Sequence, residues 1–158
     1  MAGNHVDQED LKLKLLTKAL RSGVAVRLKA YGTSMLPTLW PGDVLGIQRC
    51  IPSEIASGDI VLVAGDGRFL IHRIVDILTG RGCLRLVLRG DAMPHNDSPV
   101  HVSLLLGKVF WVERGSSRLV PVRTIPTASR IFGKALCHFD SIRSLALRVY
   151  STQMQKPR

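Results

Sequence analysis

The feature that most constrains the fold is a series of short apolar segments between residue 24 and about residue 123. Turn-forming residues separate them, as at Pro41-Gly42-Asp43 and Ser57-Gly58-Asp59. The segments are too short for typical helices and rich in Val, Ile and Leu, so they predict strands. The predicted strands cover residues 24–30, 44–48, 60–63, 69–77, 84–88, 104–112 and 119–122. Many short strands joined by turns predict a mainly β domain.

Two helices are predicted to flank the strands. Residues 7–22 carry a stripe of leucines, with Asp7 as the N-terminal cap and Gly23 after the last turn. After Pro126, residues 128–152 combine an apolar face with Lys and Arg, which predicts a basic amphipathic helix. We therefore expect an N-terminal helix over residues 1–23, a β domain over residues 24–125 and a basic helical tail over residues 126–158.

Chain length and the distribution of apolar residues predict the cellular location of the protein. The chain has 158 residues, enough for one domain with a core. No apolar run approaches the roughly 18–20 residues that a membrane-spanning helix needs. Asp7, Glu9 and Asp10 stand where a secretory signal would have its apolar core. We therefore expect a cytoplasmic protein that contacts a membrane only peripherally.

Charge gives a prediction about partners. The net charge is +10, and residues 112–158 hold 9 Lys and Arg against 2 Asp and Glu. A basic amphipathic helix over residues 128–152 predicts contact with an anionic membrane, although a helix docked on the β domain has the same pattern. A nucleic-acid partner is not expected, because residues 1–23 are too short for a DNA-reading element.

The cysteines argue against a disulfide framework or a metal centre. Cys50, Cys83 and Cys137 are odd in number, widely spaced and form no C-x-x-C motif. We expect free thiols in a reducing compartment and neither a metal nor a cofactor.

One serine lies in a turn suited to hold a reactive group. Ser34 follows Gly32, which permits close backbone approach, and precedes Pro37, which restricts the chain. A serine hydroxyl becomes a strong nucleophile only when a base removes its proton and backbone N–H groups stabilise the oxyanion. Taken alone, a serine between glycine and proline also fits an ordinary turn.

Candidate partners for that serine lie further along the chain. His72 is the histidine inside a strongly apolar strand, where a polar side chain needs a partner. Histidine, with an ordinary pKa of about 6.5, suits general-base work near neutral pH. Asp91 and Asp97 lie in a turn-rich loop and could orient such a base. From spacing alone, a structural histidine and Asx-turn aspartates remain open alternatives.

Four segments resemble the characteristic boxes of type I signal peptidases. Residues 32–43, reading Gly-Thr-Ser-Met-Leu-Pro-Thr-Leu-Trp-Pro-Gly-Asp, resemble the nucleophile box, in which Ser-Met-x-Pro precedes Gly-Asp. Residues 57–63 resemble the next box, residues 72–74 (His-Arg-Ile) the general-base box, and residues 90–97 the last. The four segments follow one another along the chain in the same order as the boxes of the family. The resemblance implies a signal peptidase/LexA-like β-barrel-type catalytic domain in the superfamily that also contains the SOS repressors.

This resemblance implies roles for individual residues. Ser34 is the expected nucleophile and, through its backbone N–H, an oxyanion donor. His72 occupies the base position, where bacterial signal peptidases have lysine, as in the archaeal and endoplasmic-reticulum branch. Asp97 is the expected orienting acid, and Asp91 is expected to organise the loop, with the choice between them open. Some relatives carry a further serine donor where this chain has Gly32.

The resemblance implies a serine endopeptidase that cleaves a precursor peptide or protein through an acyl-enzyme. The first alternative is a non-catalytic module that holds a peptide along a strand edge. The second alternative is a regulator related to the self-cleaving repressors, for which the chain offers no DNA-reading element. Substrate identity and oligomeric state do not follow from the sequence.

Overall fold

A computed structural model describes residues 3–65, 68–80 and 82–124 and, near the C-terminus, residues 132, 133, 135, 144, 147, 148 and 150. Of residues 3–10 and 13 it describes the backbone alone. The secondary structure consists of one α-helix, two 3-10 helices and eight strands within this part of the chain. In chain order these are α1 (Gly3–Arg21), β1 (Val26–Lys29), β2 (Val44–Gln48), η1 (Pro52–Glu54), β3 (Ile60–Gly65), β4 (Arg68–Gly80), β5 (Cys83–Arg89), β6 (Val100–His101), η2 (Val102–Leu104), β7 (Leu105–Arg114) and β8 (Ser117–Leu119).

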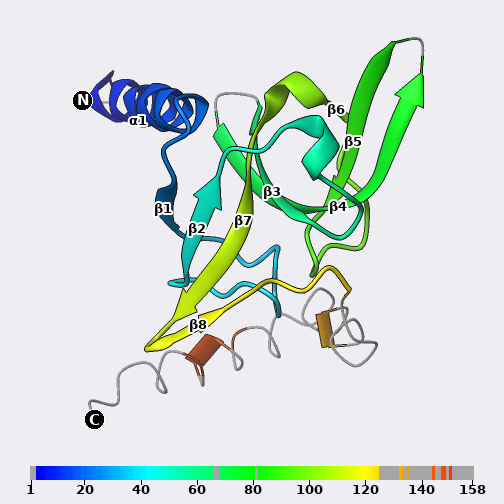
Figure 1. The fold of residues 1–158 in the computed structure, drawn as a ribbon. Helices are drawn as coiled ribbons and strands as arrows, with labels where there is room; N and C mark the ends of the chain where they lie inside the picture. The colour runs from blue at the N-terminus through cyan, green and yellow to red at the C-terminus, as the bar shows by residue number, and fades with distance from the viewer. Residues whose placement is uncertain are drawn as a thin grey trace.

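The strands form one strongly twisted antiparallel sheet (Figure 1). Their spatial order is β1-β2-β7-β3-β4-β5-β6, with β8 paired to the end of β7. β3 and β4 lie near the middle of this order, and β4 is the longest strand. The mainly β fold predicted from the sequence is confirmed.

Both faces of the central strands are buried, which explains their continuous apolar runs. Ile60 and Leu62 of β3 pack in one core cluster, together with Leu20 of α1. Val61 and Val63, which point to the opposite face, pack in a second cluster with residues of β4 and β5. A strand covered on both faces has no polar side to alternate with, so it reads as an uninterrupted apolar segment.

The N-terminal helix is longer than predicted. α1 begins at Gly3, so Asp7 lies inside the helix and does not cap it. Residues 4–6 contain no glycine or proline to break the helix, which explains the extension. The helix ends at Arg21, one residue before the predicted end, and Gly23 adopts a φ of +83° in the turn that follows.

Some strand boundaries differ from the prediction. β8 covers Ser117–Leu119, whereas residues 119–122 were expected, because Arg114 pairs with Ser117 across a two-residue turn. The strand expected to begin at residue 104 begins at Leu105, after a 3-10 turn. The short β6 was not predicted, since two residues carry no periodic pattern.

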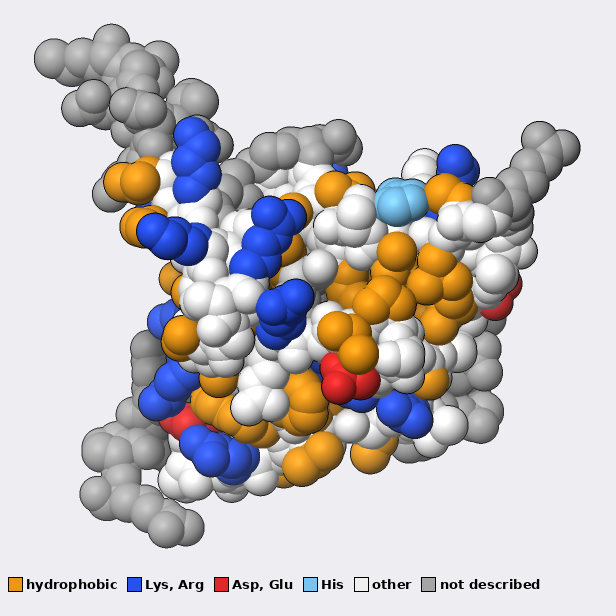
Figure 2. All heavy atoms as spheres, turned by 45° about the horizontal axis from the view of Figure 1, so that its top comes forward, with side chains coloured by type: hydrophobic (Ala, Val, Ile, Leu, Met, Phe, Trp, Pro, Cys, Tyr) orange, Lys and Arg blue, Asp and Glu red, His pale blue; other side chains and the backbone are white. Residues whose placement is uncertain are grey.

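Most of the predicted basic helix over residues 128–152 lies outside the described residues. Contact of that segment with an anionic membrane therefore stays a prediction, as does the division of the chain at residues 23 and 125. In the part of the chain that is described, no helix is long and apolar enough to cross a membrane. Exposed Lys and Arg side chains also gather over α1 (Figure 2).

Two of the three cysteines are described, and both are free thiols. Cys50 is buried, and burial raises the pKa of its thiol to about 11, which leaves it protonated near neutral pH. Cys137 lies outside the described residues. Among the residues described, no three His, Cys, Asp or Glu side chains gather as a metal site would require.

Candidate active site

Ser34 lies in the turn that follows β1. Gly32 adopts a φ of +110°, in the left-handed region that favours glycine. Leu36 N–H donates to Thr33 O at 3.2 Å, and the buried side chains of Met35 and Leu36, which follow Ser34, fix the turn to the domain. A serine at position 32 would strain this backbone, so the missing side-chain donor follows from the shape of the turn.

His72 lies in β4, directly opposite Val61 of β3. The residue is only 5% exposed, so its ring nitrogens need partners within the protein. Its Nε2 lies 2.9 Å from the Oγ of Ser34. β4 is paired with β3 on one side and with β5 on the other, and this pairing fixes the strand that carries the imidazole. The imidazole faces Ser34.

Asp97 lies in the loop between β5 and β6 and completes a chain of three side chains. Its Oδ2 lies 2.6 Å from the Nδ1 of His72. The N–H of Asp97 donates to Leu88 O at 2.8 Å, which ties the loop to the end of β5. A carboxylate at Nδ1 favours the tautomer in which Nδ1–H donates to Asp97, and Nε2 can then accept the proton of Ser34.

Asp91 has different partners. Arg73 donates from Nε and Nη2 to the two carboxylate oxygens of Asp91, at 2.8 and 2.7 Å, and Thr38 Oγ1 also donates to this carboxylate. The side chains of Asp91 and Arg73 are 2% and 6% exposed. This buried pair therefore joins the serine turn, the strand of His72 and the loop of Asp97.

Arg73 is a site residue that the sequence interpretation missed. Its Nη1 donates to Gly58 O at 2.6 Å and to Val122 O at 2.9 Å, so each side of the guanidinium is used. The signal was present, because an arginine inside an apolar strand needs a carboxylate partner.

The loop of Asp97 also touches the serine turn through its backbone. Ala92 N–H donates to Ser34 O at 2.8 Å. At Gly90 the backbone comes so close that an added Cβ would lie 2.5 Å from Ser34 O and 3.0 Å from His72 Nε2. The glycine is required by this close approach.

Replacing Gly90 by alanine is expected to slow acylation of Ser34 by about 10²-fold, because a shift of about 1 Å in a reacting group has an effect of this size. The rate constant of labelling by a fluorophosphonate measures it. Gly80→Ala is the matched control, since an added Cβ there meets nothing within 4 Å. A wild-type rate in Gly90→Ala contradicts the prediction.

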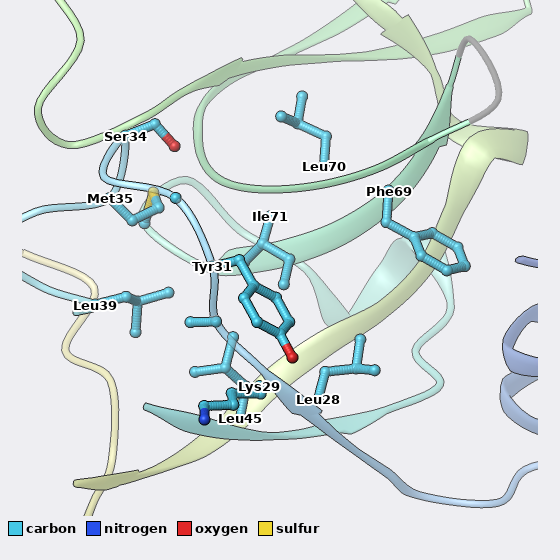
Figure 3. Close-up of a pocket in the computed structure, with 12 residues that line it drawn as sticks. Leu28, Lys29, Tyr31, Ser34, Met35, Leu39, Leu45, Phe69, Leu70 and Ile71 are labelled. Atoms are coloured by element: carbon cyan, nitrogen blue, oxygen red, sulfur yellow. The ribbon is translucent and has the colours of Figure 1, made fainter. Parts of the chain in front are cut away.

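A cavity of about 350 Å³ opens beside Ser34. Figure 3 shows Ser34 at one end of it and apolar side chains along the walls. The lining side chains come from β1, the serine turn, β2 and β4, and the largest are Leu28, Tyr31, Met35, Leu39, Leu45, Phe69, Leu70 and Ile71. Cavities of this size and character bind apolar groups of small ligands.

Two lysines of the described strands, Lys29 and Lys108, lie away from the Ser34 hydroxyl. Lys29 lines the same cavity but lies at the end remote from Ser34 (Figure 3). Lys108 Nζ donates to Asp59 Oδ2 at 2.9 Å. The side chain that contacts the Ser34 hydroxyl is an imidazole.

Comparison with protein families matches residues 2–109 to the family described as Peptidase S24-like. The chain belongs to this family. A comparison with curated proteins finds no match. The family establishes a serine-peptidase type of scaffold, and Ser34, His72 and Asp97 all lie within the residues matched.

Proposed function

We propose that this Peptidase S24-like domain is a serine endopeptidase of the signal-peptidase type. Ser34 is the nucleophile, His72 the general base and Asp97 the orienting acid. The observation that carries the proposal is the line of contacts from Ser34 Oγ to His72 Nε2, at 2.9 Å, and from His72 Nδ1 to Asp97, at 2.6 Å. Both distances lie within the reach required for proton transfer.

In the proposed reaction His72 Nε2 takes the proton of Ser34 as Oγ attacks the substrate carbonyl carbon. The resulting imidazolium is stabilised by the carboxylate of Asp97. Collapse of the tetrahedral intermediate breaks the peptide C–N bond, and the leaving amine receives the proton from His72. Water, deprotonated by the same imidazole, then hydrolyses the acyl-enzyme and restores the Ser34 hydroxyl.

The backbone N–H of Ser34 is the proposed oxyanion donor. Among the hydrogen bonds of the described residues it donates to no acceptor. Gly32 contributes no side-chain donor, so this N–H carries a larger share of the stabilisation than in relatives with a serine there.

The apolar cavity supports a substrate with an apolar residue close to the scissile bond. Burying such a side chain contributes about 25 cal/mol per Å² of apolar surface. We propose a precursor peptide or protein of this character as the substrate.

The alternative is a binding module on the same scaffold that holds peptides without cutting them. A binding module has no need of an imidazole placed between a serine hydroxyl and a carboxylate. The peptidase is therefore the better-supported function.

Active-site labelling tests the proposal. We expect a fluorophosphonate to form one covalent adduct with the folded wild-type protein, mapped by peptide mass spectrometry to Ser34. We also expect cuts beside apolar residues when the protein is incubated with a mixed peptide library. An adduct on another residue, or equal labelling of Ser34→Ala, would falsify the assignment, and peptides bound but never cut favour the binding module.

A further inference from the structure

We propose that Tyr150 and Leu147, which follow the family-matched residues 2–109, are positioning residues for the Ser34 turn. This inference rests on the proposed role of Ser34. Both side chains reach back across more than a hundred residues of sequence to the serine turn. Tyr150 contacts the far end of the turn, at Asp43, and Leu147 packs against its buried side, at Leu36. Neither side chain touches the reacting atoms.

The far end of the turn is anchored at Asp43, which is fully buried. Arg114 donates from Nε and Nη2 to its two carboxylate oxygens, at 3.0 and 2.6 Å. Trp40 N–H donates to Oδ2 at 2.8 Å, and Tyr150 OH donates to Oδ1 at 2.8 Å. Tyr150 thus supplies one of four donors to a carboxylate that has no contact with solvent.

Tyr150 remains a hydrogen-bond donor over the whole working range of pH. Burial, together with the hydrogen bond to Asp43, raises the pKa of its hydroxyl to about 12. Burial by itself would lower the pKa of Arg114, but the contacts with Asp43 raise it, so the guanidinium stays charged. Tyr150 and Arg114 therefore both remain donors to Asp43.

The ring of Tyr150 stacks on Trp40, with ring centroids 4.5 Å apart and an interplanar angle of 21°. Trp40 Nε1 in turn donates to Pro37 O at 2.8 Å, inside the serine turn. Stacked aromatic pairs stabilise a fold beyond the apolar area that they bury. The stack therefore connects Tyr150, through Trp40, to a carbonyl three residues from Ser34.

Leu147 supports the same turn from its buried side. It packs against a small cluster formed by Leu36 and Ala92, which are 0% and 6% exposed. Leu36 is two residues from Ser34, and Ala92 donates its N–H to Ser34 O at 2.8 Å. Gly133 lies beside the same loops, since a Cβ added there would come within 3.1 Å of Asp91 O.

These contacts matter because residues 33–43 form neither a helix nor a strand, so no regular ladder of backbone hydrogen bonds fixes the position of Ser34. Catalysis needs Ser34 Oγ held within about 0.5 Å of its productive position. Residues 2–109 contain the proposed triad, and Leu147 and Tyr150 hold the turn from outside that region. These two residues position the Ser34 turn and contribute no reacting atom.

The test compares Tyr150→Phe, Tyr150→Ala and Leu147→Ala in the full chain. For Tyr150→Phe, which keeps the stack and loses one hydrogen bond, we expect a rate constant of fluorophosphonate labelling about 3–10-fold lower. For Tyr150→Ala and Leu147→Ala we expect a loss of about 10²-fold through displacement of the turn. Phe110→Ala and Leu78→Ala, which change exposed apolar residues away from the site, are the controls and should label at the wild-type rate.

Hydrogen–deuterium exchange over residues 33–43 provides a second measurement that does not require activity. We expect faster exchange in Tyr150→Ala and Leu147→Ala and no change in the central strands β3 and β4. A merely structural role would lower the fraction of protein that labels and leave the rate constant of that fraction unchanged. Such a result overturns the inference, as does unchanged exchange of residues 33–43 in Tyr150→Ala.

The two proposals fail in different ways. If the wild-type protein never labels at Ser34, the proposed function is wrong. Faster exchange of residues 33–43 in the Tyr150 variants would still show that Tyr150 holds the turn. Should Tyr150→Ala not fold, Tyr150→Phe decides the matter, because it changes one oxygen atom. If Tyr150→Phe and Leu147→Ala both label at the wild-type rate, and residues 33–43 exchange at the wild-type rate in both variants, the positioning role is contradicted.

Discussion

Replacing either Ser34 or His72 by alanine is expected to lower peptide cleavage by about 10⁶-fold, the size of effect seen when one member of a serine-peptidase triad is removed. His72 Nε2 lies 2.9 Å from Ser34 Oγ, and in the proposed mechanism the hydroxyl attacks only as the imidazole takes its proton, so each group needs the other. The double variant should therefore be no slower than either single variant. Cleavage of a library-selected peptide, followed by mass spectrometry, measures the effect.

The matched control for the histidine is His101→Ala. His101 is exposed and its Nδ1 contacts Ser103, away from the proposed site. It should retain the wild-type rate. If His72→Ala cleaves within tenfold of the wild-type rate, another group is the base, and Lys29, which lines the same cavity, becomes the first candidate to replace.

The parts of the site that depend on local sequence could be predicted. Ser34 lies in a turn marked by Gly32 and Pro37, and His72 interrupts an apolar strand, so each is visible within its own segment. The resemblance to signal peptidases connected the two segments. The contact between Ser34 and His72, separated by 38 positions, follows from the fold and from no local pattern.

The parts that depend on distant partners could not be predicted. The sequence marks Asp43 as the end of a turn and of the segment that resembles the nucleophile box, but it does not indicate that Asp43 is buried against Arg114 and Tyr150. The separation of Tyr150 from Asp43 is 107 positions. Only the packing of the domain brings such groups together, and a single sequence has no pattern that records it.

The strands show the same division between local and distant causes. Residues 44–48 were predicted with the bounds that β2 has, because Pro41-Gly42-Asp43 marks the start of the strand locally. β4 runs beyond its prediction to Gly80, because its outer end pairs with β5 in a hairpin, and pairing extends a strand past its apolar core. The end of a strand is set by its neighbour as well as by its own residues.

The choice between Asp91 and Asp97, open from sequence, leads to the second large prediction. Asp97→Asn is expected to lower the rate of peptide cleavage by about 10⁴-fold with little change in thermal stability. An amide at position 97 can donate to His72 Nδ1, which favours the tautomer with the proton on Nε2, and that nitrogen can then no longer accept the proton of Ser34. The carboxylate is 30% exposed, so its loss leaves few other groups unpaired.

Asp91→Asn is the matched comparison, because it makes the same chemical change six positions away. Asp91 is 2% exposed and holds Arg73 through two hydrogen bonds, so this substitution leaves a buried guanidinium without its charge partner. Breaking such a pair costs about 3–5 kcal/mol of unfolding free energy. We expect a lower melting temperature for Asp91→Asn and a slow but stable enzyme for Asp97→Asn. The reverse pattern would make Asp91 the third member of the triad, and chemical denaturation measured beside cleavage rate distinguishes the two.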